Sequence, residues 1–162
     1  MNRTANLDTA FNPASVAIAG VGPITAGKFY LESLLSSGFK GRIYPVHPDG
    51  GEMSGLKIYP NVKDIPYSVD HLICCIPARF APQLIRDCSE KGVKVVSLFT
   101  SGFSETGTNE GQRLETEMVR LAQANGTRLI GPNCMGIYSP RVGLSFVPDF
   151  PREAGNVALV CQ

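Results

Sequence analysis

The stretch SVAIAGVGPITAGK, residues 15–28, decides the fold, because an apolar run passes through a glycine-rich turn into a helical pattern. Residues 15–20 are almost wholly apolar and predict a buried strand. Residues 21–27 include glycine and proline, which are typical of turns. From Lys28 to Ser37 apolar side chains recur near helical spacing and predict a helix. The order of strand, turn and helix predicts the first half of a βαβ unit.

The rest of the chain continues this alternation of apolar strands and amphipathic helices. We predict main strands over 42–46, 71–76, 93–99 and from 128, a short strand over 56–59, and helices over 80–91 and 110–124. Strands that alternate with helices of about ten to fifteen residues form parallel sheets with right-handed crossovers. The predicted fold class is therefore α/β: a Rossmann-like, doubly wound, mainly parallel sheet with helices on both faces.

The end of the sequence departs from this alternation. Three prolines, at positions 140, 148 and 151, interrupt the pattern, and the apolar run over 155–161 then predicts one more strand. No helix follows that strand. We therefore predict that residues 1–145 form one domain and that residues 146–162 are a linker and the first strand of a truncated second domain.

Charge and composition argue against several classes of partner. The 162 residues include 15 Lys and Arg against 14 Asp and Glu, so the net charge is +1 and no nucleic-acid partner is predicted. Neither a long apolar run nor a signal peptide is visible, so we predict a cytoplasmic protein with no membrane contact. The five cysteines show no C-x-x-C spacing, which indicates reduced thiols and predicts no metal site.

Five predicted turns would meet at one edge of the sheet, where ligands of open parallel sheets bind outside the carboxyl ends of the strands. They are residues 20–27, 46–49, 76–79, 100–105 and 131–136. All are rich in Gly, Pro, Ser, Thr or Asn, which expose backbone N–H groups and permit close approach. We expect a shared ligand site, with Gly131 placed where the backbone approaches the ligand.

The first of these turns resembles a dinucleotide fingerprint without matching it. Gly20 and Gly22 have the right spacing, but Thr25 stands where the third glycine is expected. Near the end of the second strand only Asp49 could hold a ribose, so an NAD(P)-binding domain of an oxidoreductase or redox sensor stays open as an alternative. The free N–H groups at the start of the following helix favour a phosphate. No catalytic residue is predicted, and both histidines are expected to be structural.

Five segments together resemble a known family. They are FNPASVA (11–17), GFKGRIYPVHP (38–48), IPA (76–78), SGFSETG (101–107) and LIGPNCMGI (129–137). In this combination the chain resembles the CoA-binding domain of NDP-forming acyl-CoA synthetases, which are relatives of the succinyl-CoA synthetase alpha subunit. The similarity runs from about residue 8 to the end of the chain.

The resemblance implies that the chain binds coenzyme A within an enzyme that interconverts acid, CoA and ATP with acyl-CoA, ADP and phosphate. The implied binding residues fall into groups along CoA: Gly20, Gly22, Thr25, Gly27 and Lys28 for the phosphates; Val46 and Pro48 for the adenosine side; Ile76, Pro77 and Ala78 for the nucleotide and pantetheine; and Thr100, Ser101, Gly102, Pro132, Asn133 and Cys134 for the thiol end. Cys134 is expected to shape the pocket and not to act as a nucleophile.

Other parts of such an enzyme would bind ATP or ADP and Mg²⁺. The resemblance implies that the partners are the remaining ligase domains or a beta-type subunit. Family members often carry Lys where this chain has Asp49, so one phosphate contact is in doubt. A CoA-sensing regulatory module of an acyltransferase stays open as a second alternative.

Overall fold

The computed structural model describes residues 5–161, and its centre is a sheet of five parallel strands. The strand order is β2-β1-β5-β6-β7. These strands are β1 (Ser15–Ala19), β2 (Arg42–Val46), β5 (His71–Cys74), β6 (Val95–Leu98) and β7 (Arg128–Ile130). All four neighbouring pairs run parallel, which confirms the predicted mainly parallel sheet.

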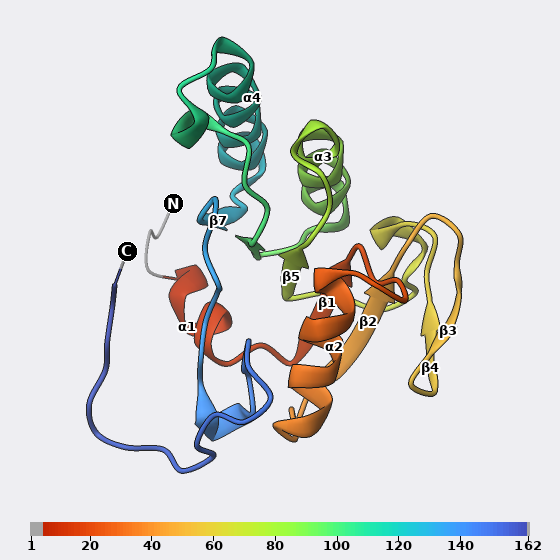
Figure 1. Cartoon of the computed structure of the whole chain (residues 1–162), viewed down its shortest axis with the longest axis vertical. Helices are drawn as coiled ribbons and strands as arrows, with labels where there is room; N and C mark the ends of the chain where they lie inside the picture. Colours follow the sequence, from red (N-terminus) through yellow and green to blue (C-terminus); the bar gives the residue numbers. More distant parts are fainter. Residues whose placement is uncertain (1–4, 162) are drawn as a thin grey trace.

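Helices cover both faces of the sheet, as the doubly wound prediction requires. They are α1 (Ala5–Phe11), α2 (Ala26–Ser36), α3 (Ala81–Lys91) and α4 (Asn109–Asn125). Figure 1 shows α3 and α4 together on one side of the sheet and α1 and α2 on the other. Two separate apolar cores agree with this arrangement.

The alternation of side chains along β1 divides the core between the two faces. Ala17 and Ala19 pack into the core that includes α3 and α4, whereas Val16 and Ile18 pack into the core that includes α2. This is the period of two expected of a strand, and both faces are apolar because both are covered. Burying a large aliphatic side chain stabilises the fold by about 1.5 to 3 kcal/mol, so β1 anchors both layers.

Side-chain caps fix where the helices begin. The Thr25 hydroxyl accepts a hydrogen bond from the Lys28 N–H at 3.3 Å, so α2 starts at Ala26, two residues before the predicted start. The Thr108 hydroxyl accepts from the Gly111 N–H at 3.1 Å in the same way and starts α4. The apolar face predicted for α4 is buried against the sheet.

Shorter elements fill the connections. An antiparallel hairpin, β3 (Gly51–Met53) and β4 (Leu56–Ile58), lies beside β2 and contains the short strand predicted over 56–59. Among residues 5–161 the connections also hold the 3₁₀ turns η1 (Val62–Asp64), η2 (Ala78–Phe80), η3 (Ser104–Thr106) and η4 (Pro140–Val142). Strand β3 and helix α1 were not predicted, because neither carries a periodic apolar pattern long enough to recognise.

The strand predicted over 155–161 is not formed. Val157, Leu159 and Val160 are 89%, 85% and 94% exposed, and no secondary structure is assigned to this segment. Strands need a neighbour for their backbone hydrogen bonds, and the edge strand β7 pairs only with β6 among residues 5–161. The apolar pattern is therefore present without the partner strand that it requires. Within the described part of the chain, no helix is long and apolar enough to cross a membrane.

Candidate functional site

The strand order places a topological switch point between β1 and β5. The helix that follows β1 is α2, on one side of the sheet, and the helix that follows β5 is α3, on the other side (Figure 1). Where connections leave neighbouring strands toward opposite faces, the loops at the carboxyl ends separate and leave room for a ligand. The turns after β1 and β5 lie on the two sides of this switch point, and both were predicted to belong to the site.

The turn after β1 is closed by internal hydrogen bonds. The N–H groups of Gly20 and Val21 both donate to the Val46 carbonyl, at 2.9 and 3.2 Å, and tie the turn to the end of β2. The Gly22 N–H donates to the Thr25 hydroxyl at 2.9 Å, and that hydroxyl lies 3.1 Å from the Gly22 carbonyl. Thr25 therefore closes the turn and caps α2 with one oxygen.

Gly27 takes over the packing role of the missing third glycine. A Cβ at this position would lie 2.6 Å from the Gly20 carbonyl carbon and 2.8 Å from the Val21 nitrogen, so only glycine lets α2 approach the turn this closely. In the dinucleotide fingerprint the third glycine serves the same close packing of helix on strand. The third glycine of the fingerprint is thus present two residues later than the usual spacing places it, so the spacing alone did not reveal it.

The first turn of α2 presents an anion-binding end. Within residues 5–161 the backbone N–H groups of Ala26 and Gly27 have no acceptor, as expected for the first turn of a helix. The helix dipole adds partial positive charge at the same place. Lys28 follows in the same turn, with its ammonium 3.6 Å from Glu32 on the helix surface and its side chain partly exposed.

At the end of β2, Val46 is buried while Pro48 and Asp49 are exposed. The Asp49 carboxylate lies 3.4 Å from His47 Nδ1. His47 was expected to be only structural, yet its ring lies beside the turn after β1, because a Cβ on Gly22 would be 4.0 Å from His47 Nε2. Sequence reasoning missed this neighbour, since the two residues come from different strands.

The ends of β5, β6 and β7 converge around Thr100. Its buried hydroxyl donates to the Ile76 carbonyl at 2.8 Å, and its own carbonyl accepts from the Asn133 N–H at 3.0 Å. Gly102 lies close to Ala78, since a Cβ on Gly102 would be 3.2 Å from the Ala78 Cβ. The structure thus brings together predicted residues from three turns. Pro77 and Ser101 are exposed on the same rim.

Glu105 lies in a predicted turn but was not among the predicted binding residues, and it shapes the turn after β6. Its carboxylate accepts from the Gly102 N–H at 2.6 Å and from the Phe103 N–H at 3.0 Å. Loss of hydration favours the neutral acid, but these backbone hydrogen bonds outweigh it and lower the pKa of Glu105. Two backbone donors of the rim are therefore already occupied by a side chain of the same loop.

In the Gly-Pro-Asn-Cys turn, Gly131 has a packing role that the sequence did not indicate. Gly131 has φ +97°, and a Cβ there would lie 2.7 Å from the Leu98 carbonyl oxygen, so the glycine is required by packing against β6. The Gly131–Pro132 peptide bond is cis. The Cys134 N–H donates to the same Leu98 carbonyl at 3.1 Å and holds the half-buried cysteine at the rim.

Tyr30 joins this turn to α2. The Tyr30 hydroxyl donates to the Met135 carbonyl at 2.6 Å, and burial is the main cause that raises the pKa of this phenol. A neutral phenol keeps its proton and can remain the donor in this bond. Helix α2, whose first turn belongs to the predicted phosphate site, is thus tied to the turn predicted to line the thiol end of CoA.

A family described as "CoA binding domain" matches residues 14–140 of the chain. The chain belongs to this CoA-binding family. Its relatives include the alpha subunits of ADP-forming acetate–CoA ligases I and II of Pyrococcus furiosus, which are 39% and 40% identical over 97% and 96% of this chain. These matches span 35% and 34% of the relatives, so the chain covers about a third of their length.

A solved relative supports the same assignment. The dinucleotide-forming acetyl-coenzyme A synthetase 1 of Candidatus Korarchaeum cryptofilum, solved with phosphate and ADP, matches with a TM-score of 0.81 at 39% identity. The match covers 91% of this chain and 32% of that one. The predicted fold class and the predicted family are both confirmed. The family match and these relatives give no support to the NAD(P) alternative.

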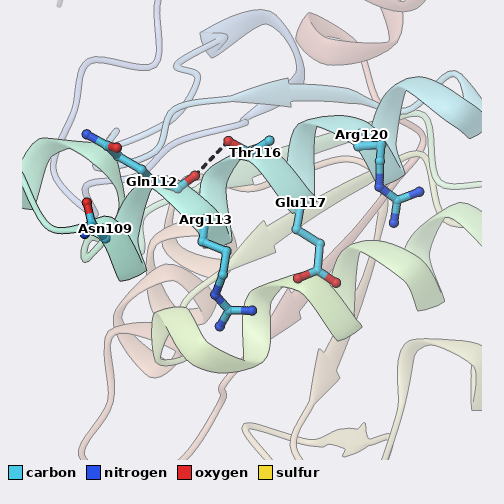
Figure 2. A pocket seen from close by; sticks show the side chains of 6 residues that line it. All are labelled: Asn109, Gln112, Arg113, Thr116, Glu117 and Arg120. Carbon is cyan, nitrogen blue, oxygen red and sulfur yellow. Dashed lines mark hydrogen bonds between the residues drawn. The ribbon is translucent and has the colours of Figure 1, made fainter.

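One hollow of this CoA-binding domain lies outside the predicted rim. It has a volume of about 450 Å³ and runs along one face of α4 (Figure 2). Its lining residues are Asn109, Gln112, Arg113, Thr116, Glu117 and Arg120. The charges there are paired at the surface, Arg113 with Glu110 at 3.0 Å and Glu117 with Arg86 at 3.9 Å. One polar helix face with paired charges is typical of a solvated surface.

The described part of the chain holds no cluster of three or more His, Cys, Asp or Glu side chains that could bind a metal ion. Its five cysteines are all free thiols. Cys74 and Cys88 are buried, Cys75 and Cys134 are half-buried, and Cys161 is exposed. Burial raises the pKa of the Cys74 and Cys88 thiols, so these two remain protonated core side chains.

Proposed function

We propose that this chain binds coenzyme A along the carboxyl edge of its sheet, as the CoA-binding domain of an ADP-forming acyl-CoA synthetase. The match of the CoA-binding family to residues 14–140 carries this proposal. The closed glycine turn and the free N–H groups at the start of α2 support a phosphate at the place where such folds bind nucleotides.

The phosphates of CoA would lie against the turn of residues 20–27 and the first turn of α2. A helix dipole contributes only about 0.3 to 2 kcal/mol, whereas micromolar binding requires about 8 kcal/mol. Lys28 would leave Glu32 and supply charge, and the apolar side chains of Val46 and Ile76 would contribute contact area. The remaining free energy would come from the pantetheine arm along the rim.

The thiol end of CoA would lie near Thr100, Asn133 and Cys134. The Thr100 hydroxyl is already engaged with the Ile76 carbonyl, so it would position the wall and not bind the thiol directly. Cys134 would contribute a small apolar wall. In the whole enzyme the CoA thiol would attack an activated acyl group, and the residues of this chain would hold and orient CoA for that step.

We also propose that residues 153–162 lie outside the CoA-binding unit and belong to a linker and to the next domain. The preceding residues 146–152, predicted as part of this linker, pack on the unit: Phe146 contacts the core on the α2 side, the Phe150 ring packs edge-on against Tyr138, and Arg152 donates to the Ser36 carbonyl. The exposed apolar side chains of Val157, Leu159 and Val160 support this division, since contiguous exposed apolar residues usually pack against something else. ATP, Mg²⁺ and the acyl substrate would be bound by the other domains or by a partner subunit.

Isothermal titration calorimetry tests the proposed function directly. Wild-type chain should bind CoA with a dissociation constant at or below about 1 mM, whereas NADH should give no heat of binding. A folded chain that binds NADH and not CoA would overturn the proposal.

A pair of glycine variants locates the site. Neither Gly22 nor Gly155 has a positive φ or a backbone clash. A Cβ on Gly155 would meet nothing closer than 4.0 Å, and one on Gly22 would meet the Thr25 Cγ2 at 3.3 Å, a tight contact that the threonine side chain can relieve by a small shift. Gly22→Ala should weaken CoA binding by about tenfold, because the added methyl group enters the phosphate turn, and this corresponds to about 1.4 kcal/mol. The matched control Gly155→Ala should bind CoA like the wild type. Equal affinities for both variants would place the phosphates elsewhere.

A further inference from the structure

His47 is held rigidly at the carboxyl end of β2. Its N–H donates to the Tyr59 carbonyl at 3.0 Å, and its own carbonyl accepts from the Gly50 N–H at 2.9 Å. These two bonds fix the backbone on both sides of the residue. The side chain is 32% exposed, so one part of the ring is packed and another part reaches solvent.

Asp49 engages one ring nitrogen in both protonation states. The Asp49 N–H lies 3.3 Å from Nδ1 and the Asp49 carboxylate lies 3.4 Å from it. When the ring is neutral, Nδ1 accepts from the N–H, and the proton of the ring must then sit on Nε2. When the ring is protonated, Nδ1 donates to the carboxylate and Nε2 carries the second proton. Nε2 is therefore a hydrogen-bond donor in either state.

The Nε2–H donor of His47 lies beside the glycine turn after β1. A Cβ on Gly22 would be 4.0 Å from Nε2 and 3.3 Å from the Thr25 Cγ2, so the ring edge and the turn border one space. No carboxylate from the turn competes for Nε2, because residues 20–27 contain no acidic side chain. Asp49 engages Nδ1, and Lys28, in the first turn of α2, pairs with Glu32.

The geometry points to His47 as a phosphate-binding residue of the CoA site, with Nε2–H as the donor and Asp49 as the residue that fixes the ring. This inference rests on the proposed binding of CoA. It adds a side-chain donor from the end of β2 to the backbone donors of the turn over residues 20–27. Asp49 thereby has a role although its carboxylate cannot itself bind a phosphate. The donor reaches either the pyrophosphate or the 3′-phosphate of CoA, and ligands that differ in the 3′-phosphate distinguish the two.

Three variants at position 47 test the inference by calorimetry with CoA. His47→Ala removes the donor and should weaken CoA binding by about tenfold or more, the usual effect of losing a hydrogen bond to a charged group. His47→Gln places an amide nitrogen near the position of Nε2 and should keep the affinity within about threefold of the wild type. His47→Asn reaches only the position of Nδ1 and should behave like His47→Ala.

Dephospho-CoA, which lacks the 3′-phosphate, identifies the phosphate. If His47→Ala weakens the binding of CoA but not of dephospho-CoA, the donor binds the 3′-phosphate; if it weakens both, the donor binds the pyrophosphate. Thermal unfolding of each variant checks that the domain stays folded. If the wild type binds CoA and His47→Ala binds it with the same affinity, the inference about His47 is wrong. It is also wrong if His47→Gln and His47→Asn bind CoA equally well. Neither result would affect the proposed function. Absence of CoA binding in the wild type would instead overturn the proposed function.

Discussion

The buried histidine at the start of β5 makes a quantitative prediction for acid stability. His71 is 1% exposed, and its Nε2 lies 2.8 Å from the Ser97 hydroxyl. It lines a small cavity of about 10 Å³ on the α2 side of the sheet. Burial lowers its pKa from 6.5 to about 4, because the charged ring would lose its hydration.

The sign of the effect follows from proton binding in the two states. Below pH 6.5 the unfolded chain protonates this histidine, while the folded chain resists protonation until the pH approaches 4. The unfolded state therefore binds more protons in this window, and stability falls as the pH falls. A tenfold difference in proton affinity is worth about 1.4 kcal/mol, so the full loss is about 3 kcal/mol, of which about 2 kcal/mol is lost by about pH 4.5.

Urea unfolding followed by circular dichroism measures this loss, and the absence of tryptophan makes fluorescence a weaker probe. The control is His71→Gln, which keeps an amide near the Ser97 hydroxyl but does not titrate. Between about pH 7 and about pH 4.5 the wild type should lose about 2 kcal/mol more than the variant. Asp87, whose pKa is also lowered, titrates in both proteins and cancels in the comparison. The same pH dependence in both proteins would refute the reasoning.

Two further predictions concern packing and domain limits. Gly27→Ala should lower the free energy of unfolding by about 1 to 3 kcal/mol, because the new methyl group meets the backbone of Gly20 and Val21. Urea unfolding measures this loss, with Gly155→Ala as the control. Equal stability of the two variants would contradict the packing role of Gly27. Replacing Val157, Leu159 and Val160 together with serine should change the free energy of unfolding by less than about 0.5 kcal/mol, and a larger loss by the same assay would place the segment inside the CoA-binding unit.

The sequence predicted the order of the main elements because their signals are local. The apolar runs of the central strands and the buried face of α4 follow periodicities that can be read within about ten to fifteen residues. Strand order depends on pairing between distant segments, as between Ala17 and Leu72, and no local pattern encodes it. The same limit explains the run over 155–161, whose pattern is that of a strand but whose state depends on a neighbour.

The location of the candidate site at one edge of the sheet could be predicted from the sequence, but most contacts between its residues could not. Topology alone places the turns after parallel strands at one edge, which is why the predicted residues from three turns meet around Thr100. Glu105 and His47 were missed because their significance lies in what they face. One is a carboxylate that closes its own loop, and the other is a ring beside a turn from another strand.

The glycines of the rim show why a motif cannot by itself separate packing from binding. A Cβ on Gly20 would lie 2.6 Å from the Cys75 carbonyl oxygen, and Gly27 and Gly131 are likewise fixed by backbone atoms. Gly22 differs, because the nearest atoms to its absent Cβ belong to the side chains of Thr25 and His47. The fold therefore requires three of these glycines whether or not a ligand binds. At Gly22 an added methyl group would meet a side chain and not the backbone, so substitutions there disturb the fold less than at the other three positions and report on binding more directly.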